Sequence, residues 1–307
     1  MRLKLSPLFS VAPLLTASLL FLSQPVFADL LEQRLASTRT GDNLSCATCH
    51  RETRVITGGT AGLGDRRADL LSVSAVIDLV GEASILAFSD PQDADGDGIS
   101  GRPSWVLSLR DQRAVVGRFG WKASVGTLED QIANALATDM GLENALLTCA
   151  DHSCFADQPG CLVSNQNDGS GLLDALSKEV RALRESVKVD AGAGLSLFQQ
   201  IGCAGCHQPR MNTPAKEPVW LFSDLLLHDM GPDLREDQRV GGAWRSEWRT
   251  APLIGLSKRS TYLHDGRSKT IPSAIAAHAG EAEASAISFM ALAPSDRLVL
   301  IEFLLSL

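Results

Sequence analysis

Two short segments of the chain combine cysteines and a histidine at the same spacing. Cys46-x-x-Cys49-His50 and Cys203-x-x-Cys206-His207 both read C-x-x-C-H. Two thiols at this spacing can add to the two vinyl groups of one haem, while the adjacent imidazole binds the iron. With seven cysteines and six histidines in 307 residues, chance would give roughly 0.003 matches per chain. The alternatives are a zinc site or a redox-active cysteine pair with an incidental histidine.

The duplicated motif therefore predicts two covalently bound c-type haems. Cys46, Cys49, Cys203 and Cys206 would form the thioether bonds, and the adjacent His50 and His207 would be proximal iron ligands.

The N-terminus has the pattern of a secretory signal peptide. Arg2 and Lys4 precede an apolar run from Leu8 to Leu22, and small residues at the cleavage spacing end at Ala28. A membrane anchor is the alternative, but the run is short for a span. We expect cleavage after about Ala28 and a periplasmic protein with no transmembrane anchor after processing. Export agrees with haem attachment, which takes place outside the cytoplasm.

The other three cysteines, Cys149, Cys154 and Cys161, lie in one polar segment. One local disulfide is favoured over a metal site there, and the pattern leaves open which two of the three pair. The formal net charge of −8 becomes −10 when cleavage removes Arg2 and Lys4. An acidic chain argues against nucleic acid as a partner.

Helical patterns dominate the rest of the sequence. Apolar residues recur at helical spacing over residues 128–140 and 172–183, a helix ending near Ile201 would deliver Cys203, and Ser295 would cap a last helix. No run of alternating strands is evident. We expect a mainly α fold of two cytochrome c-like haem domains with much irregular connecting chain. After the signal peptide (1–28), these would be residues 29–190 and 191–307, because glycines interrupt the pattern near the boundary.

An acidic loop at residues 93–99 resembles the first half of a calcium-binding loop. Asp93, Asp95 and Asp97 alternate with small residues, but Ser104 takes the place of the usual glutamate at the twelfth position. The loop predicts a calcium site completed by other oxygens, and a solvated acidic turn is the alternative.

Several longer segments resemble the di-haem oxidoreductase family and, more distantly, bacterial di-haem cytochrome c peroxidases and the di-haem enzyme of methylamine dehydrogenase maturation. The segments that carry the resemblance are 85–91, 101–103, 117–123, 224–232, 247–253, 263–267 and 278–282. The resemblance implies a peroxidase in which the C-terminal haem receives electrons and the N-terminal haem reduces the oxidant.

The resemblance also implies catalytic residues in the N-terminal half. Trp121, Gln131 and the pair Asp139-Met140 resemble the tryptophan, glutamine and Glu-Met pair of the peroxidases. Gln131 and Asp139 would then lie over the open face of the first haem, where a carboxylate can move a proton between the two oxygens of peroxide. Trp121 would carry an electron between the haems, with core packing as the alternative. The peroxidases often have a displaceable distal histidine, but no histidine occurs between Arg51 and Asp151.

The sixth ligand of the C-terminal haem has four candidates: Met230, His228, His264 and His278. The stretch 270–278 resembles the short helix that ends in the ligating methionine of di-haem peroxidases, and His278 falls at that position. Ala274, Ile275 and His278 would share one face of this helix. We therefore expect His278 as ligand, with a role on the surface or at a propionate as the alternative.

Together these patterns predict a periplasmic di-haem c-type peroxidase. Its oxidant would be hydrogen peroxide or a similar compound, and its electron donor a small redox protein such as a cytochrome or a copper protein. A non-catalytic electron-transfer cytochrome, or an enzyme that oxidatively modifies a partner protein, are the alternatives. A catalyst needs one iron with an open coordination position, whereas a carrier usually has two six-coordinate irons.

Overall fold

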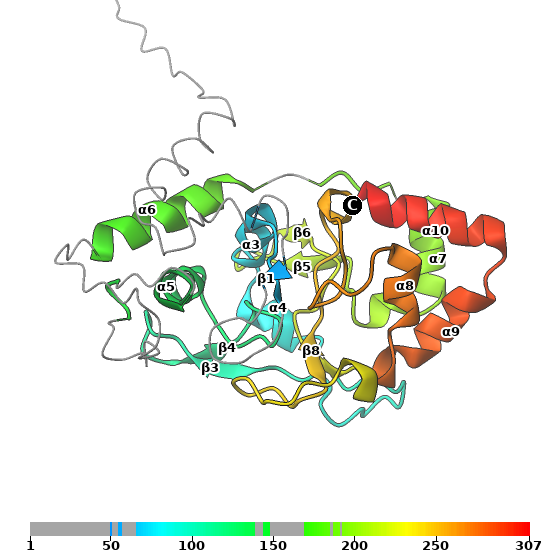
Figure 1. Ribbon diagram of the computed structural model, residues 1–307, viewed down its shortest axis with the longest axis horizontal. Coiled ribbons are helices and arrows are strands. Elements are labelled where there is room, and N and C mark those ends of the chain that lie inside the picture. The colour runs from blue at the N-terminus through cyan, green and yellow to red at the C-terminus, as the bar shows by residue number, and fades with distance from the viewer. Residues whose placement is uncertain are drawn as a thin grey trace, which may run out of the picture.

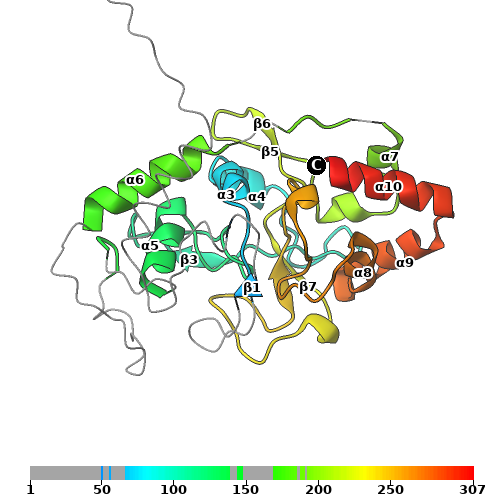
Figure 2. The same ribbon diagram turned by 45° about the horizontal axis from the view of Figure 1, so that its top comes forward.

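Helices lie at both ends of the molecule, with short hairpins and irregular chain between them (Figure 1). The computed structural model describes residues 50, 55–56, 66–138, 144–147, 169–184, 187–190 and 192–307. Helices α5 and α6 lie at one end and α7 to α10 at the other, and the turned view in Figure 2 keeps this separation. The helices are α3 (Leu71–Ile77), α4 (Glu82–Leu86), α5 (Leu128–Thr138), α6 (Gly169–Ala182), α7 (Ala193–Gln200), α8 (Ile271–Ala276), α9 (Glu283–Ala291) and α10 (Pro294–Ser306).

The strands of the described residues form four separate antiparallel pairs. The prediction of a mainly α fold is therefore confirmed only in part. Each strand has two or three residues, which is too short for an alternating pattern to be recognised in the sequence. The pairs are β1 (Val55–Ile56) with β2 (Arg66–Arg67), β3 (Trp105–Leu107) with β4 (Ala114–Val116), β5 (Arg210–Asn212) with β6 (Pro218–Trp220), and β7 (Leu227–Asp229) with β8 (Glu247–Arg249).

The predicted helices agree with α5, α6, α7 and α10 to within a few residues. The predicted cap of α10 is wrong, because Ala293 precedes the helix without a side-chain cap and Pro294 stands in its first turn. Proline has a fixed φ that suits this position and lacks the N–H that would otherwise need a partner. Helix α8 lies within the stretch 270–278, where the sequence predicts a short helix. It has Pro272 in its first turn, and the structure adds a capping box between Thr270 and Ser273.

One hydrophobic core takes residues from both halves of the chain. Val73 and Ile77 of α3 belong to the same buried cluster as Phe198 of α7 and Leu300 of α10. Gly194 lies inside α7, where a Cβ would come within 2.3 Å of Phe303 Cβ. This glycine therefore permits the close approach of α7 and α10, although the sequence suggested an interruption there. The division at residue 190 stays a prediction.

No helix within the described ranges is long and apolar enough to cross a membrane. The predicted signal peptide, Cys46 and Cys49, and the cluster of Cys149, Cys154 and Cys161 all lie outside the described residues.

Candidate haem sites

The end of α7 positions the second C-x-x-C-H motif. Gly202 follows the helix with φ +87°, a left-handed conformation that glycine adopts without strain. A short 3₁₀ turn over Cys203–Gly205 then reverses the chain before the second thiol and His207. The backbone N–H of His207 donates to Cys203 O over 2.9 Å. The turn holds both thiols and the imidazole close together, as attachment of one haem requires.

Both cysteines and His207 line a cavity of about 190 Å³ that also contains His278. Much of its wall is apolar and comes from α7, α8 and α10. Burial raises the pKa of the Cys203 thiol to about 12, and it also raises the pKa of Cys206. The large side chains of the apolar wall include Phe198, Leu253, Ile271, Leu300 and Leu304.

Two imidazoles meet in this cavity. His207 and His278 have ring centroids 6.5 Å apart. His207 Nδ1 lies 3.0 Å from Phe222 O, and His278 Nδ1 lies 2.7 Å from Ala274 O. A carbonyl can only accept, so Nδ1 carries the proton in each ring and both Nε2 atoms keep their lone pairs.

These two rings fit opposite sides of one iron. Metal–nitrogen bonds of about 2 Å on both sides of one ion put the ring centroids roughly 6 Å apart. Burial, and then the neighbouring His278, lower the pKa of His207 to about 4, and burial also lowers the pKa of His278. Both rings are therefore neutral near pH 7, the form that binds metals. The ligand role of His278 stays a proposal, which this geometry supports.

His228, another sixth-ligand candidate, has both ring nitrogens engaged. Its Nε2 donates to Asp224 Oδ2 over 2.9 Å, and its Nδ1 donates to Glu281 Oε2 over 2.8 Å. Burial alone would lower the pKa of His228, but Asp224, Cys206 and Glu281 raise it well above its usual value. An imidazolium held between two carboxylates has no lone pair for iron.

The backbone at Gly280 allows this arrangement. Its φ is +57°, and a Cβ there would lie 2.2 Å from Asp229 O. The close approach brings the next residue, Glu281, onto His228, and Glu281 also accepts hydrogen bonds from Ser100 and from Asp229 N. Any side chain at Gly280 would push the two segments apart.

Aromatic and cationic side chains surround another part of the same cavity. His264 stacks on Trp248 with ring centroids 3.8 Å apart, and Lys122 Nζ lies 3.4 Å from the centroid of Trp248. Burial lowers the pKa of His264 to about 4 and that of Lys122 to about 8. Trp121 meets His264 edge to face at 6.4 Å, and its Nε1–H donates to Arg67 O over 2.8 Å.

Of the predicted catalytic residues, Trp121 lines the cavity. Gln131 is half-buried on α5 and is not among the residues that line it. Asp139 lies outside the described residues. The predicted roles of these three residues belong to the first haem and stay predictions.

The first haem motif is described only at His50. Its Nδ1 donates to Asp69 O over 2.6 Å, which leaves Nε2 as the possible ligand atom, as in His207. The Asp69 carboxylate contacts Arg67 and Arg249. Burial alone would raise the pKa of Asp69, but Arg67, Arg259 and Arg249 lower it.

Sequence reasoning missed the buried partners in and around the cavity. Arg67, Arg249 and Arg259 line it, and Asp224 and Glu281 hold His228. The one available signal was a charged residue inside an otherwise buried segment, such as His228 directly after the run 225–227. That signal predicts a buried partner, yet it does not say which residue is the partner.

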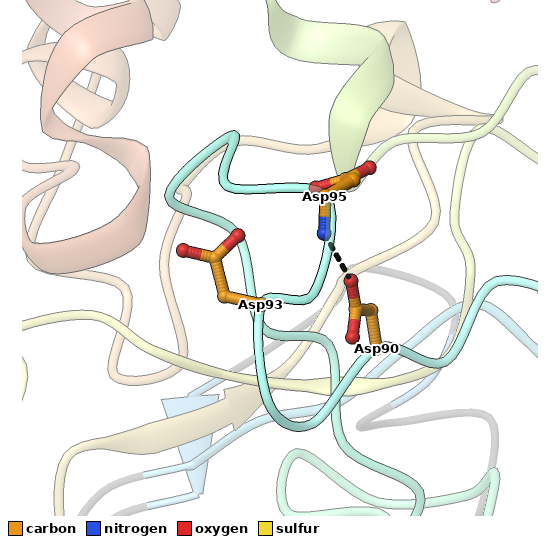
Figure 3. Close-up of side chains that lie close together, drawn as sticks. All are labelled: Asp90, Asp93 and Asp95. Carbon is orange, nitrogen blue, oxygen red and sulfur yellow. Dashed lines mark hydrogen bonds between the residues drawn. The ribbon is translucent and has the colours of Figure 1, made fainter.

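The predicted calcium loop contains a carboxylate cluster in which Asp90 takes the place of the predicted Asp97. Ligand atoms of Asp90, Asp93 and Asp95 lie within 4.8 Å of one another, and Figure 3 shows the three side chains. Asp90 also accepts from the backbone of Ala94 and Asp95, and Asp97 accepts from Ile99 N. These bonds shape the turn without any ion. Calcium binding there stays a prediction.

Comparison with known proteins agrees with these features. The family model described as "di-haem oxidoreductase, putative peroxidase" matches residues 63–157 and 173–307. No curated protein matches the sequence. A structure of hydrazine synthase from Kuenenia stuttgartiensis under xenon pressure is similar over 100% of this chain and 99% of that chain, with 16% identity and a TM-score of 0.47. That similarity is too low to support a functional conclusion. The family match covers most of the chain, which confirms the predicted resemblance: the protein belongs to the di-haem oxidoreductase family.

Proposed function

We propose that the protein is a periplasmic di-haem c-type peroxidase. Its C-terminal haem, attached to Cys203 and Cys206, receives electrons from a small cytochrome or copper protein. Its N-terminal haem, attached to Cys46 and Cys49, reduces hydrogen peroxide. The observation that carries the proposal is that His207 and His50, the two proximal histidines, have different surroundings.

At the C-terminal site, His207 and His278 would hold the haem iron. Their Nδ1–H groups donate to backbone carbonyls, which fixes each ring and directs Nε2 to the metal. A six-coordinate iron has no position for peroxide and is suited to electron transfer. His228 stays outside the coordination shell, because Asp224 and Glu281 occupy both of its nitrogens.

At the N-terminal site, His50 would be the proximal ligand, and His207, His278 and His228 have partners of their own elsewhere. His207 and His278 face each other, His228 lies between carboxylates and His264 stacks on Trp248. The one other histidine, His152, lies outside the described residues. This distribution supports an open position on the first iron.

When bound, the haem would supply the iron that binds the oxidant and would pass on the electrons that reduce the oxidant. The protein supplies proton transfer and orientation. Asp139 takes the proton from the near oxygen of peroxide and returns it to the far oxygen, and Gln131 orients the molecule. Trp121, which lines the cavity and is fixed by its hydrogen bond to Arg67 O, carries electrons between the two sites.

Low-temperature electron paramagnetic resonance of the resting mature protein tests this proposal. We expect one high-spin and one low-spin haem per chain, and loss of the high-spin signal when peroxide is added. Steady-state turnover with peroxide and a reduced small cytochrome provides the second measurement. Two low-spin haems and no turnover would identify an electron-transfer cytochrome instead.

A further inference from the structure

Three buried arginines line the cavity that contains His207 and His278. Arg67 and Arg249 are each 2% exposed, and Arg259 is 7% exposed. They come from three separate parts of the chain: β2, β8 and the 3₁₀ turn at Leu256–Lys258. A buried cation is costly unless a nearby negative charge compensates it. So many arginines at one place therefore require acceptors.

The protein supplies one carboxylate to this group. Asp69 lies 3.4 Å from Arg67 NH2 and 3.3 Å from Arg249 NH2. Both contacts are longer than the usual charge-assisted bond of about 2.7–2.9 Å. The nearby Asp224 is already engaged by His228 and by Leu226 N. Among the described residues, Asp69 is the one carboxylate that forms an ion pair with these arginines, and it contacts Arg67 and Arg249 but not Arg259.

Arg259 has the least complete set of partners. Its NH2 donates to Pro252 O and Ile254 O over 3.1 and 3.4 Å, and both acceptors are neutral carbonyls. Its Nε is buried and has no hydrogen-bond partner among the described residues. Tyr262, which lines the same part of the cavity, offers only a hydroxyl. A further anionic acceptor would complete the site.

We propose that Arg67, Arg249 and Arg259 form a carboxylate-binding site for the two propionates of the C-terminal haem. The planar guanidinium of a buried arginine binds carboxylates with good geometry, and Arg259 has an unpartnered Nε for this purpose. Thioether bonds fix the vinyl edge of the porphyrin, and the propionates leave from the opposite edge. In Figure 1, β8 lies in the middle of the molecule, away from α7. The inference rests on haem attachment at Cys203 and Cys206 but not on peroxidase activity.

Infrared spectroscopy of protein with carboxyl-labelled haem tests this site. Growth on ¹³C-carboxyl 5-aminolevulinate labels the propionates, so their bands in a redox-difference spectrum are told apart from those of aspartate and glutamate. In the unmodified protein we expect ionised propionates only. Arg259→Met removes one cation at similar volume, so it should shift the labelled bands and lower the midpoint potential of the C-terminal haem.

Arg239→Met is the matched control, because Arg239 is exposed and stacks on Trp244. It should leave both the labelled bands and the potential unchanged. If Arg259→Met does not accumulate, Arg259→Lys keeps the charge but loses the planar fork, and we expect shifted bands with a nearly unchanged potential. A pyridine haemochrome assay of every variant should give two haems. A lower value in the unmodified protein would contradict haem attachment rather than this site.

A free carboxylate from solution could also bind to these arginines, and added acetate distinguishes it from the haem propionates. If the arginines bind a free anion, added acetate should shift the potential of the unmodified protein but not that of Arg259→Met, while the labelled bands stay the same in both proteins. That result would overturn the assignment to propionates. Labelled bands that are identical in the unmodified protein, Arg259→Met and Arg259→Lys would overturn it as well.

Discussion

His50 and His207 follow the same cysteine spacing but have different surroundings. His207 faces the ring of His278 across an apolar cavity, whereas His50 lies beside Asp69, whose carboxylate contacts Arg67 and Arg249. In both histidines Nδ1 is fixed by a backbone carbonyl, so the proximal sides are alike. Under the proposed function, the attachment motif supplies the proximal ligand, while a residue far away in sequence decides whether the iron stays open.

The largest expected effect comes from removing each attachment site in turn. Changing Cys203→Ala together with Cys206→Ala should remove one haem per chain, and Cys46→Ala with Cys49→Ala should remove the other. Each pair forms both thioether bonds to its own haem. A pyridine haemochrome assay counts the haems, with Cys149→Ala as the control that keeps both. Fewer than two haems in the unmodified mature protein would contradict the di-haem assignment.

The next change removes the difference between the two sites. His278→Ala should convert the C-terminal haem from low spin to high spin, since the sixth ligand is lost while His207 remains. Electron paramagnetic resonance at low temperature measures the change. Met230→Ala serves as the comparison and should leave the spin state as it is. A sulfur-to-iron charge-transfer band that disappears in Met230→Ala but persists in His278→Ala would assign the ligand to Met230.

A change at the open site should slow catalysis and leave the C-terminal site intact. Asp139→Asn should reduce peroxide turnover by about 10²–10⁴-fold, the usual contribution of a positioned acid–base group. The spectra of both haems should be retained. Asp174→Asn, on the exposed side of α6, is the matched control. Unchanged turnover in Asp139→Asn would exclude this residue from the mechanism.

The smallest expected effect concerns the imidazolium next to the C-terminal site. Glu281→Gln should lower the free energy of unfolding by about 1–3 kcal/mol at about pH 6, because it weakens a buried charged hydrogen bond. Urea unfolding measures the difference. Glu217→Gln is the control, because Glu217 is exposed. An equal loss of stability in both variants would contradict the role of Glu281.

The pH dependence of that difference follows from both groups. The folded pKa of His228 is raised, so its contribution is complete below the unfolded value of about 6.5 and is lost as the pH rises through the folded value. Burial alone would raise the pKa of Glu281, but hydrogen bonds from His228 and Ser100 lower it to about 2. Its contribution is complete above the usual 4.5 and is lost as the pH falls toward 2. The loss of unfolding free energy in Glu281→Gln should therefore be largest between pH 4.5 and about pH 6.5, and it should decrease in alkaline solution.

Local sequence signals predicted the helices well, and they predicted the hairpins poorly. The periodic stretches that became α5, α6 and α7 each extend over two or more turns, so their apolar spacing is visible in the sequence. The hairpins contain strands of two or three residues, and their pairing depends on contacts between segments such as β7 and β8. Ser295 was a plausible cap by residue type, but Pro294 already starts the helix.

The sequence by itself determined the family, and it predicts the attachment chemistry, because the thiols and imidazole of each motif are neighbours along the chain at the spacing that a haem requires. It also indicated His278, since a helix over 270–278 would have placed Ala274, Ile275 and His278 on one face; α8 ends at Ala276, yet all three residues line the cavity. Only the tertiary structure decided which groups surround them. The arginines that share Asp69, and the carboxylates that hold His228, come from distant segments. Their partners are set by how those segments pack, which no local spacing encodes.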